Sequence, residues 1–488
     1  MRGIVSIAGY VPRHRLERAE AATFLGSGGG SGTRSVAAHD EDSTTMGVES
    51  ARLALRSVPG ARPSTLWFAT TTPAYLDKTN AATVHAALGL PATTGAYDFG
   101  GALRSATGAL AAALDGGGTV AVVTADVRDG LPSSADEAGG GDGAATVVVG
   151  DGSDGAPVVA ALIGRASVTD EFVDRWRTPG DRRSRTWEER FGETRYVPLG
   201  AEAFTDALSS AGLEAGDVTR VAVTGMHARA ARALGRRLGV GEAAIADDLS
   251  RTVGQAGTAH PLLVLAAQVE EAQPGDVVAV VHLADGADAF VFRVTEARAG
   301  WQPDRPVADQ VAAGAPLPYG RFLAWRGMLT PEPPRRPEPA RVSASAAWRS
   351  EAWKFRFVGS EDRASGAVHL PPARVSMEGG AVDDMVPVER SDTLATVATY
   401  TVDRLAYSPS PPIVFAVLDF DGGGRFPVEL TDVDADAVRI GDRVEMTFRR
   451  LFTADGIHNY FWKATPVRAR AAGGTGPRPR DGGSRRTN

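Results

Sequence analysis

The chain has 488 residues, 43% of them hydrophobic, and a formal net charge of -7 at neutral pH. One hydrophobic core rarely serves such a length, so we expect about three structural units of roughly 150 residues each. The acidic balance argues against a nucleic-acid surface, and no apolar run reaches the ~20 residues of a membrane span. No leader is evident, so we expect a cytoplasmic location. The absence of cysteine excludes disulfides, thiolate nucleophiles and cysteine–zinc sites.

Short β-rich runs alternate with alanine-rich helical stretches over the first 300 residues, which predicts a layered α/β core. Examples of these runs are 3–8, 45–58, 66–70 and 79–88. Asp42 and Ser43 are suited to cap the helix predicted over 45–58. The apolar positions expected on its buried side are Met46, Leu53 and Leu55.

A weak internal repeat divides this region into two similar halves. GDGAATVVVG at 141–150 and ADGADAFVFRV at 284–294 each place Asp-Gly-Ala before a hydrophobic strand. Asp-Gly before a strand is also common turn chemistry, so the motif alone leaves the repeat open. Two α/β halves, 1–165 and 166–300, are the simplest description.

Proline and arginine dominate the next stretch, 301–348, most clearly in PEPPRRPEPARV, and this composition predicts an extended linker with a helix. Between 349 and 470 many short β runs alternate with Gly, Pro and Asp turns, which is typical of a small barrel. The triple glycine at 422–424 lacks the helix and Lys-Ser/Thr pair of a phosphate loop, so we expect a hairpin turn. The Gly- and Arg-rich end, 471–488, is expected to be disordered.

The segment YDFGGALRSATGAL at 97–110 resembles the nucleophile segment of 3-hydroxy-3-methylglutaryl-CoA (HMG-CoA) synthases, members of the thiolase superfamily. In that family a cysteine at a helix start becomes a thiolate and accepts the acyl group. The resemblance places Leu103 at the cysteine position. FATTTPAYLDKTNAATVHAALGLP resembles the segment with the general-base glutamate, and places Thr71 there. Neither side chain can perform the family's chemistry.

Two further family positions keep polar side chains. VAVTGMHARAARALGRRLG resembles the segment of the catalytic histidine, which maps to His227, and the asparagine that binds the thioester carbonyl maps to Gln255. Gln255 can still donate, at longer reach. Ser105 lies about 200° around the helix from the nucleophile position and should point away. His260 and His282 are expected to be packing residues. The resemblance covers nearly all of residues 1–300.

The C-terminal part resembles the zinc-ribbon/OB-fold proteins that accompany thiolases and HMG-CoA synthases. In GSEDRASGAVHLPPARVSMEGG the family's four zinc positions fall on Asp362, Ser365, Ser376 and Gly379. Serine and glycine are poor tetrahedral zinc ligands and one carboxylate is insufficient, so we expect no structural zinc and no other metal. The fold predicted overall is a duplicated thiolase-like α/β fold followed by an all-β OB-fold barrel.

The resemblance implies a CoA thioester as ligand or substrate, with no other cofactor. Candidate contacts to the CoA phosphates are Lys78, Arg104 and Arg229, although surface charges on helices are usually just solvated. Partners expected from the family are a second copy in a homodimer, a thiolase, or both.

Three functions remain open from the sequence. The first is an acyl-CoA-binding subunit or scaffold of a thiolase-type complex, without the nucleophile. The second is a cysteine-independent enzyme, either a C–C lyase or an acyltransferase of retro-aldol or Claisen type, in which His227 transfers protons. The third is an OB-fold interaction protein without affinity for acyl-CoA.

Overall fold

The computed structural model describes residues 1–467, without the side chain of Glu189. The expected C-terminal tail, 471–488, lies outside these residues. Within the described span, no helix combines the length and apolar character that crossing a bilayer requires.

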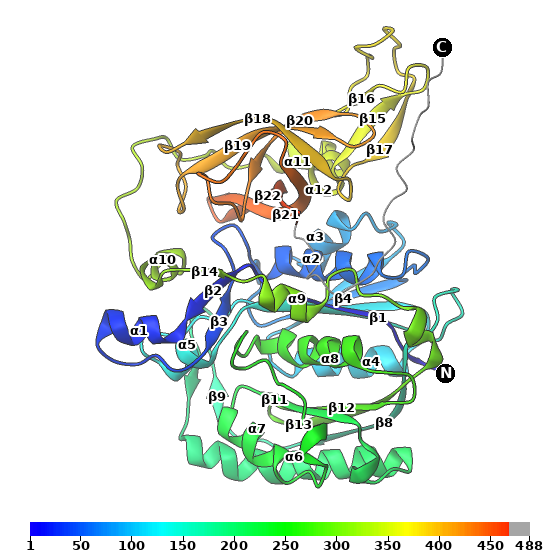
Figure 1. Cartoon of the computed structure of the whole chain (residues 1–488), viewed down its shortest axis with the longest axis vertical. Coiled ribbons are helices and arrows are strands. Elements are labelled where there is room, and N and C mark those ends of the chain that lie inside the picture. Colours follow the sequence, from blue (N-terminus) through cyan, green and yellow to red (C-terminus); the bar gives the residue numbers. More distant parts are fainter. Residues whose placement is uncertain (468–488) are drawn as a thin grey trace, which may run out of the picture.

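A nine-stranded mixed sheet is the framework of the first 300 residues (Figure 1). Its order is β11 (Arg220–Gly225), β12 (Val277–Leu283), β13 (Gly286–Val294), β8 (Ala160–Thr169), β1 (Gly3–Tyr10), β7 (Gly143–Gly150), β6 (Val120–Asp126), β4 (Thr65–Thr70) and β5 (Gly95–Gly100). The antiparallel pair β1–β8 joins the two halves of the sheet, with Gly3 opposite Ala161. Strands β4, β5 and β6 are parallel, as expected for strands joined through helices.

Three layers of helices enclose the two halves of the sheet, which confirms the predicted layered α/β fold (Figure 1). The layers are α2 (Ser43–Arg56) with α3 (Ala81–Ala87), then α4 (Ser105–Asp115) with α8 (His260–Glu271), then α6 (Glu189–Ala211) with α7 (Ala228–Gly235). The middle layer packs against both halves, because its core cluster contains residues of β1 and β7 as well as β12 and β13.

Local signals fix the start of α2. The Asp42 carboxylate accepts from the Thr45 amide at 2.9 Å, and the Thr45 hydroxyl accepts from the Asp42 amide at 2.9 Å, forming a capping box. Asp42 is thus the cap, and Ser43 is the first helical residue. The predicted apolar positions are buried or half-buried: Met46, Leu53 and Leu55.

The two Asp-Gly-Ala motifs occupy equivalent strands. β7 runs antiparallel between β1 and β6, and β13 runs antiparallel between β12 and β8. Each strand is therefore central to its half of the sheet, and the placement supports the internal repeat.

The extended linker starts later in the chain than the composition suggested. Residues 301–328 fold back on the α/β region, where Trp301 is buried and Phe322 and Leu323 join a small core with Leu16. The N-terminal elements at this contact are β2 (His14–Glu17), α1 (Arg18–Leu25) and β3 (Thr33–Val36). The elements of residues 301–328 are α9 (Val307–Ala312), β14 (Ala315–Pro316) and α10 (Tyr319–Trp325). Residues 329–343 contain no helix or strand, and α11 (Ala344–Arg349) and α12 (Glu351–Arg356) follow.

The remaining chain forms a three-stranded ribbon and a closed five-stranded barrel. The ribbon strands are β16 (Val368–His369), β15 (Val358–Asp362) and β17 (Met385–Glu389), and the barrel strands are β18 (Ala395–Asp403), β19 (Ile413–Phe420), β20 (Arg425–Leu430), β22 (Ile457–Pro466) and β21 (Arg443–Ala454). Gly422, Gly423 and Gly424 all have positive φ between antiparallel β19 and β20, which confirms the predicted hairpin turn.

The barrel packs on the α2 side of the sheet through a buried ionic network (Figure 1). Arg449 of β21 contacts Glu41 at 2.5 Å and Asp432 at 3.0 Å. Lys463 of β22 contacts Asp40 at 3.0 Å. Because Asp40 and Glu41 directly precede α2, these contacts tie the barrel to the α/β region.

Candidate functional site

A cavity of about 1190 Å³ lies among segments that are far apart in the sequence. Its walls come from α5 (Ala135–Gly139) and the loop before it, the segment with β9 (Arg175–Trp176) and β10 (Arg185–Thr186), the β11–α7 connection, and the segment that ends at Gln255. Ligand pockets usually measure about 300–1,000 Å³, so this cavity has room for a large ligand.

His227 is on the cavity wall at the start of α7. Its Nδ1 accepts a hydrogen bond from the Ala230 amide at 3.1 Å, so the side chain caps the helix. A neutral imidazole that accepts through Nδ1 carries its proton on Nε2 and can donate from there. The structure thus orients the ring by the backbone of its own helix.

Asp174 is a buried carboxylate beside His227, and sequence reasoning missed it. A methyl group at Gly192 would lie 2.5 Å from His227 Cδ2 and 2.7 Å from Asp174 Oδ1, so the two side chains converge where α6 has no side chain. Burial raises the pKa of Asp174, while nearby His227, Arg175 and Tyr196 oppose that shift. No sequence pattern marked Asp174, because Asp174 and His227 are far apart in the chain and meet only in the fold.

Gln255 lies on the same cavity wall as His227. Its backbone is fixed: its amide donates to the Gly139 carbonyl at 2.9 Å, and its carbonyl accepts from the Gly141 amide at 3.1 Å. The two polar positions suggested by the family resemblance therefore face one space.

Leu103 and Thr71 are not among the residues that line the cavity. Leu103 is half-buried in the turn before α4. The Thr71 hydroxyl donates to Asp126 at 2.9 Å and accepts from Arg128 at 3.0 Å, so it belongs to a buried polar cluster. The Ser105 hydroxyl donates to the Gly100 carbonyl at 3.2 Å. None of these groups is presented to a ligand in the cavity.

His260 and His282 are buried behind this region, with exposed fractions of 1% and 2%. Burial lowers the pKa of each ring to about 4. His282 Nδ1 lies 3.0 Å from the Thr224 hydroxyl on the neighbouring strand. Both rings are therefore neutral, packed side chains near pH 7.

The three expected phosphate contacts lie outside the cavity lining. Arg104 donates two hydrogen bonds to Asp288, at 3.0 and 2.8 Å, and these bonds raise its pKa. Lys78 donates to the Thr79 carbonyl at 3.0 Å, and Arg229 pairs with Glu193 at 3.1 Å. The arginines that do line the cavity are Arg18, Arg175, Arg183, Arg232, Arg236 and Arg251.

Polar contacts hold together the former zinc positions of the ribbon. The Ser365 hydroxyl donates to Asp362 at 2.6 Å, and contacts from Ser365 and Ser376 lower the pKa of Asp362 to about 2. The Ser376 hydroxyl also donates to the Glu378 carbonyl at 2.7 Å. Gly379 has a φ of 87°, a left-handed conformation that suits glycine.

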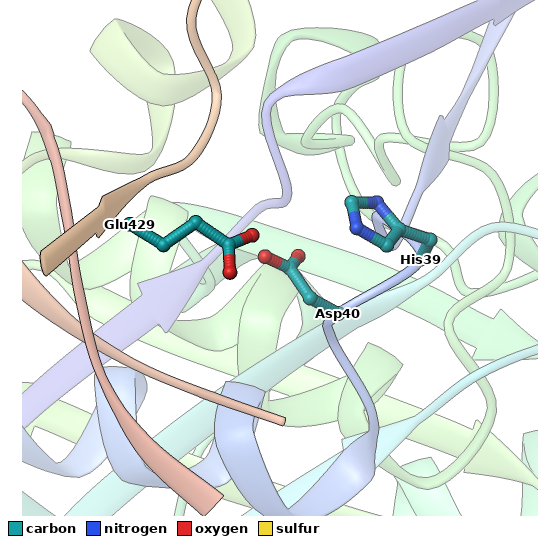
Figure 2. A group of neighbouring side chains, drawn as sticks. All are labelled: His39, Asp40 and Glu429. Carbon is teal, nitrogen blue, oxygen red and sulfur yellow. The ribbon is translucent and has the colours of Figure 1, made fainter. Parts of the chain in front are cut away.

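A second group of candidate metal ligands, His39, Asp40 and Glu429, lies between the two domains (Figure 2). The carboxylates of Asp40 and Glu429 face each other in Figure 2. The Lys463 ammonium contacts both of them, and burial lowers the pKa of His39 to about 4. Because the chain's own cation occupies this position, we assign no metal ion to the cluster.

Residues 388–449 match the family described as "ChsH2, C-terminal OB-fold domain". The N-terminal region is homologous to curated hydroxymethylglutaryl-CoA synthases. It is 26% identical over 301 residues to the Pyrococcus furiosus protein, covering 60% of this chain and 85% of that protein. It is 28% identical over 311 residues to the Methanopyrus kandleri protein, covering 60% and 88%.

Solved structures show the same fold. The HMG-CoA synthase from Bacillus subtilis superposes with a TM-score of 0.57 at 16% identity, covering 67% of this chain and 89% of that one. The 3-oxoacyl-(acyl carrier protein) synthase III from Pseudomonas aeruginosa gives 0.52 at 20% identity, covering 60% and 98%. The chain therefore combines an HMG-CoA synthase-like region of the thiolase superfamily with a C-terminal OB-fold domain.

Proposed function

We propose that this protein binds a CoA thioester in the cavity without storing the acyl group covalently, as an acyl-CoA-binding subunit or scaffold of a thiolase-type complex. The observation that carries the proposal is the lining of the cavity. His227 and Gln255 are on its wall, whereas Leu103 and Thr71 are outside it and carry neither a thiol nor a carboxylate. The site keeps groups that bind a thioester carbonyl and lacks those that accept the acyl chain.

Charge supports CoA as the ligand. Six arginines and five acidic residues line the cavity of a chain whose net charge is -7, and guanidinium groups suit phosphates. Arg175 is already paired with Asp136, at 2.8 and 2.6 Å, so the other five are the better candidates. One solved HMG-CoA synthase is a complex with CoA, and another solved relative is a complex with HMG-CoA.

An unpaired sheet edge supports assembly with a second copy. In the described residues β5 ends the sheet and pairs only with β4, and Tyr97 on this strand is 58% exposed. An open edge strand is a template for pairing with another chain. We expect a homodimer through β5, which can also bind a thiolase. Light scattering of the purified protein measures the mass of this assembly.

Calorimetric titration with acetyl-CoA, acetoacetyl-CoA and hydroxyacyl-CoA thioesters tests the proposal. We expect binding heat without product. His227→Ala should weaken thioester binding about tenfold, because one hydrogen bond to the carbonyl is lost. The control is His85→Ala, at a histidine on α3 that bonds to the Pro91 carbonyl and lies outside the cavity lining. Absence of binding by every thioester would overturn the proposal and favour an OB-fold interaction protein.

The convergence of Asp174 and His227 at Gly192 favours a second candidate, a lyase of hydroxyacyl-CoA. In a retro-aldol step, the Asp174 carboxylate, which lines the cavity, removes the β-hydroxyl proton as the Cα–Cβ bond breaks. A carbonyl compound leaves, and the thioester enolate takes the proton back at Cα. The Nε2–H of His227 would donate to the enolate oxygen of the thioester.

Turnover of a hydroxyacyl-CoA by the purified protein distinguishes the two candidates. A lyase requires turnover that Asp174→Asn abolishes and that His227→Ala reduces. Binding of the thioester without carbonyl product after prolonged incubation would exclude the lyase and leave the binding subunit.

A further inference from the structure

The floor of the cavity beyond His227 is apolar. Val221 and Val223 of β11 point to the same face of the sheet, because they are two residues apart on a strand. Ala231 on α7, Val240 and Ile245 complete this surface. We call these five residues the apolar pouch.

The pouch is continuous with the position of the thioester carbonyl. His227 follows β11 directly and begins α7, so one connection carries both the polar group and the pouch walls. Ile245 lies beside Val221 in an isolated parallel bridge, and the Ala246 amide donates to the Val221 carbonyl at 2.9 Å. The segment after α7 therefore folds back along the open edge of β11 and closes the pouch.

Small residues keep the pouch open. Ala231 and Gly235 lie on the face of α7 that lines the cavity. A Cβ built at Gly235 would meet no atom within 4 Å, so the space beside this turn of the helix is empty. Large side chains on that face would fill the same space.

Three large apolar side chains of the cavity lining are exposed to solvent, whereas Val221, Val223 and Ala231 of the pouch are buried, with exposed fractions of 0%, 8% and 4%. Ile245 is 41% exposed, and on other parts of the lining Leu131 is 58% and Trp187 is 60% exposed. Large apolar side chains that share one concave surface usually mark a binding site. A hydrocarbon covers the pouch favourably, because removing apolar surface from water is stabilising.

We propose that the thioester carries an extended apolar acyl chain, whose carbonyl lies at His227 and whose hydrocarbon end fills the pouch. This inference rests on the proposed thioester binding. Arg18, Arg183 and Arg251, which lie on other segments of the lining than the pouch, suit the CoA phosphates. A short acyl group would leave the pouch hydrated.

Affinity measured against chain length tests the acyl class. The probes are straight-chain saturated acyl-CoA thioesters from acetyl to decanoyl, titrated into the full chain. We expect the affinity to rise about fourfold per added methylene, the value for burying one CH₂, until the pouch is full. Equal affinity for all lengths would overturn the acyl class but leave thioester binding intact. No binding at any length would overturn both proposals.

Gly235→Leu is the matching variant, because its side chain extends into the empty space at the pouch. It replaces glycine in a helix, so folding should be retained. We expect the gain in affinity for long chains, measured relative to acetyl-CoA, to fall at least tenfold. Gly108→Leu is the control, since Gly108 is exposed on α4 with no atom within 4 Å of its Cβ position. Retention of the full chain-length gain in Gly235→Leu would overturn the placement of the acyl chain.

Discussion

Replacing Arg449 by methionine removes the central cation between the barrel and the α/β region while keeping an aliphatic side chain of similar length. Arg449 is 1% exposed, and its guanidinium lies 2.5 Å from Glu41 and 3.0 Å from Asp432, whose exposed fractions are 2% and 1%. Removing one partner of a buried ion pair costs about 3–5 kcal/mol, because the remaining charge is left without compensation. We expect a loss of this size in the free energy of unfolding.

The pH dependence of this loss follows from Glu41. Burial raises the pKa of Glu41, and Arg449 opposes the shift. Without Arg449, the folded-state pKa of Glu41 rises further above its unfolded value. The variant is therefore more stable at a pH below the unfolded pKa than at a higher pH, and it loses this stability as the pH rises through the folded-state pKa. The deficit relative to wild type should therefore be smaller at pH 5 than at pH 7.

Urea unfolding at both pH values measures the loss, and trypsin provides a structural test. The segment 329–343 contains exposed arginines, so trypsin cleavage there breaks the covalent link between the barrel and the α/β region. The wild-type fragments should co-elute on gel filtration, and the Arg449→Met fragments should separate. The control is Arg425→Met, which breaks an exposed pair with Asp419 and should cost less than about 1 kcal/mol. Co-eluting Arg449→Met fragments with a loss below about 1 kcal/mol would refute the role of the network.

Three further predictions concern the nucleophile position, a buried carboxyl and the ribbon. Leu103→Cys gives a protein with one thiol, and intact mass after incubation with acetyl-CoA should show no acetyl adduct, because position 103 is outside the cavity lining. Glu270→Gln should stabilise the protein increasingly from pH 5 to 8, by about 1.4 kcal/mol per pH unit in urea unfolding. Burial raises the pKa of Glu270 to about 8, so the wild type loses stability as pH rises from the unfolded value of 4.5 through 8. EDTA should leave thermal unfolding unchanged. Asp362→Ala should speed proteolysis of the ribbon, because Asp362 accepts the hydrogen bond that the Ser365 hydroxyl donates.

The fold was predictable where neighbouring residues decide it. The cap at Asp42, the apolar positions of α2 and the hairpin at 422–424 all depend on contacts within a few residues. The linker start was placed too early, because the Pro- and Arg-rich composition hid Phe322 and Leu323, which find apolar partners near the N-terminus. Composition alone does not reveal a contact between segments 300 residues apart.

The candidate site was only partly predictable for the same reason. His227 and Gln255 could be found because each lies in a segment that resembles its family counterpart. Asp174 and the cavity arginines had no such guide, since their role depends on how α6, α7 and the segment from 174 to 187 meet in space. The one available signal was the density of arginines between 175 and 185.

The barrel lies away from the cavity. Every residue that lines the cavity lies between Arg18 and Gln255, so within the described residues no barrel side chain contributes to it. The barrel instead covers α2, on the opposite side of the first half of the sheet (Figure 1). Thioester binding should then depend on His227 and be insensitive to Arg449→Met. If the variant loses affinity as well as stability, the barrel must act on the cavity through the sheet or from a second copy.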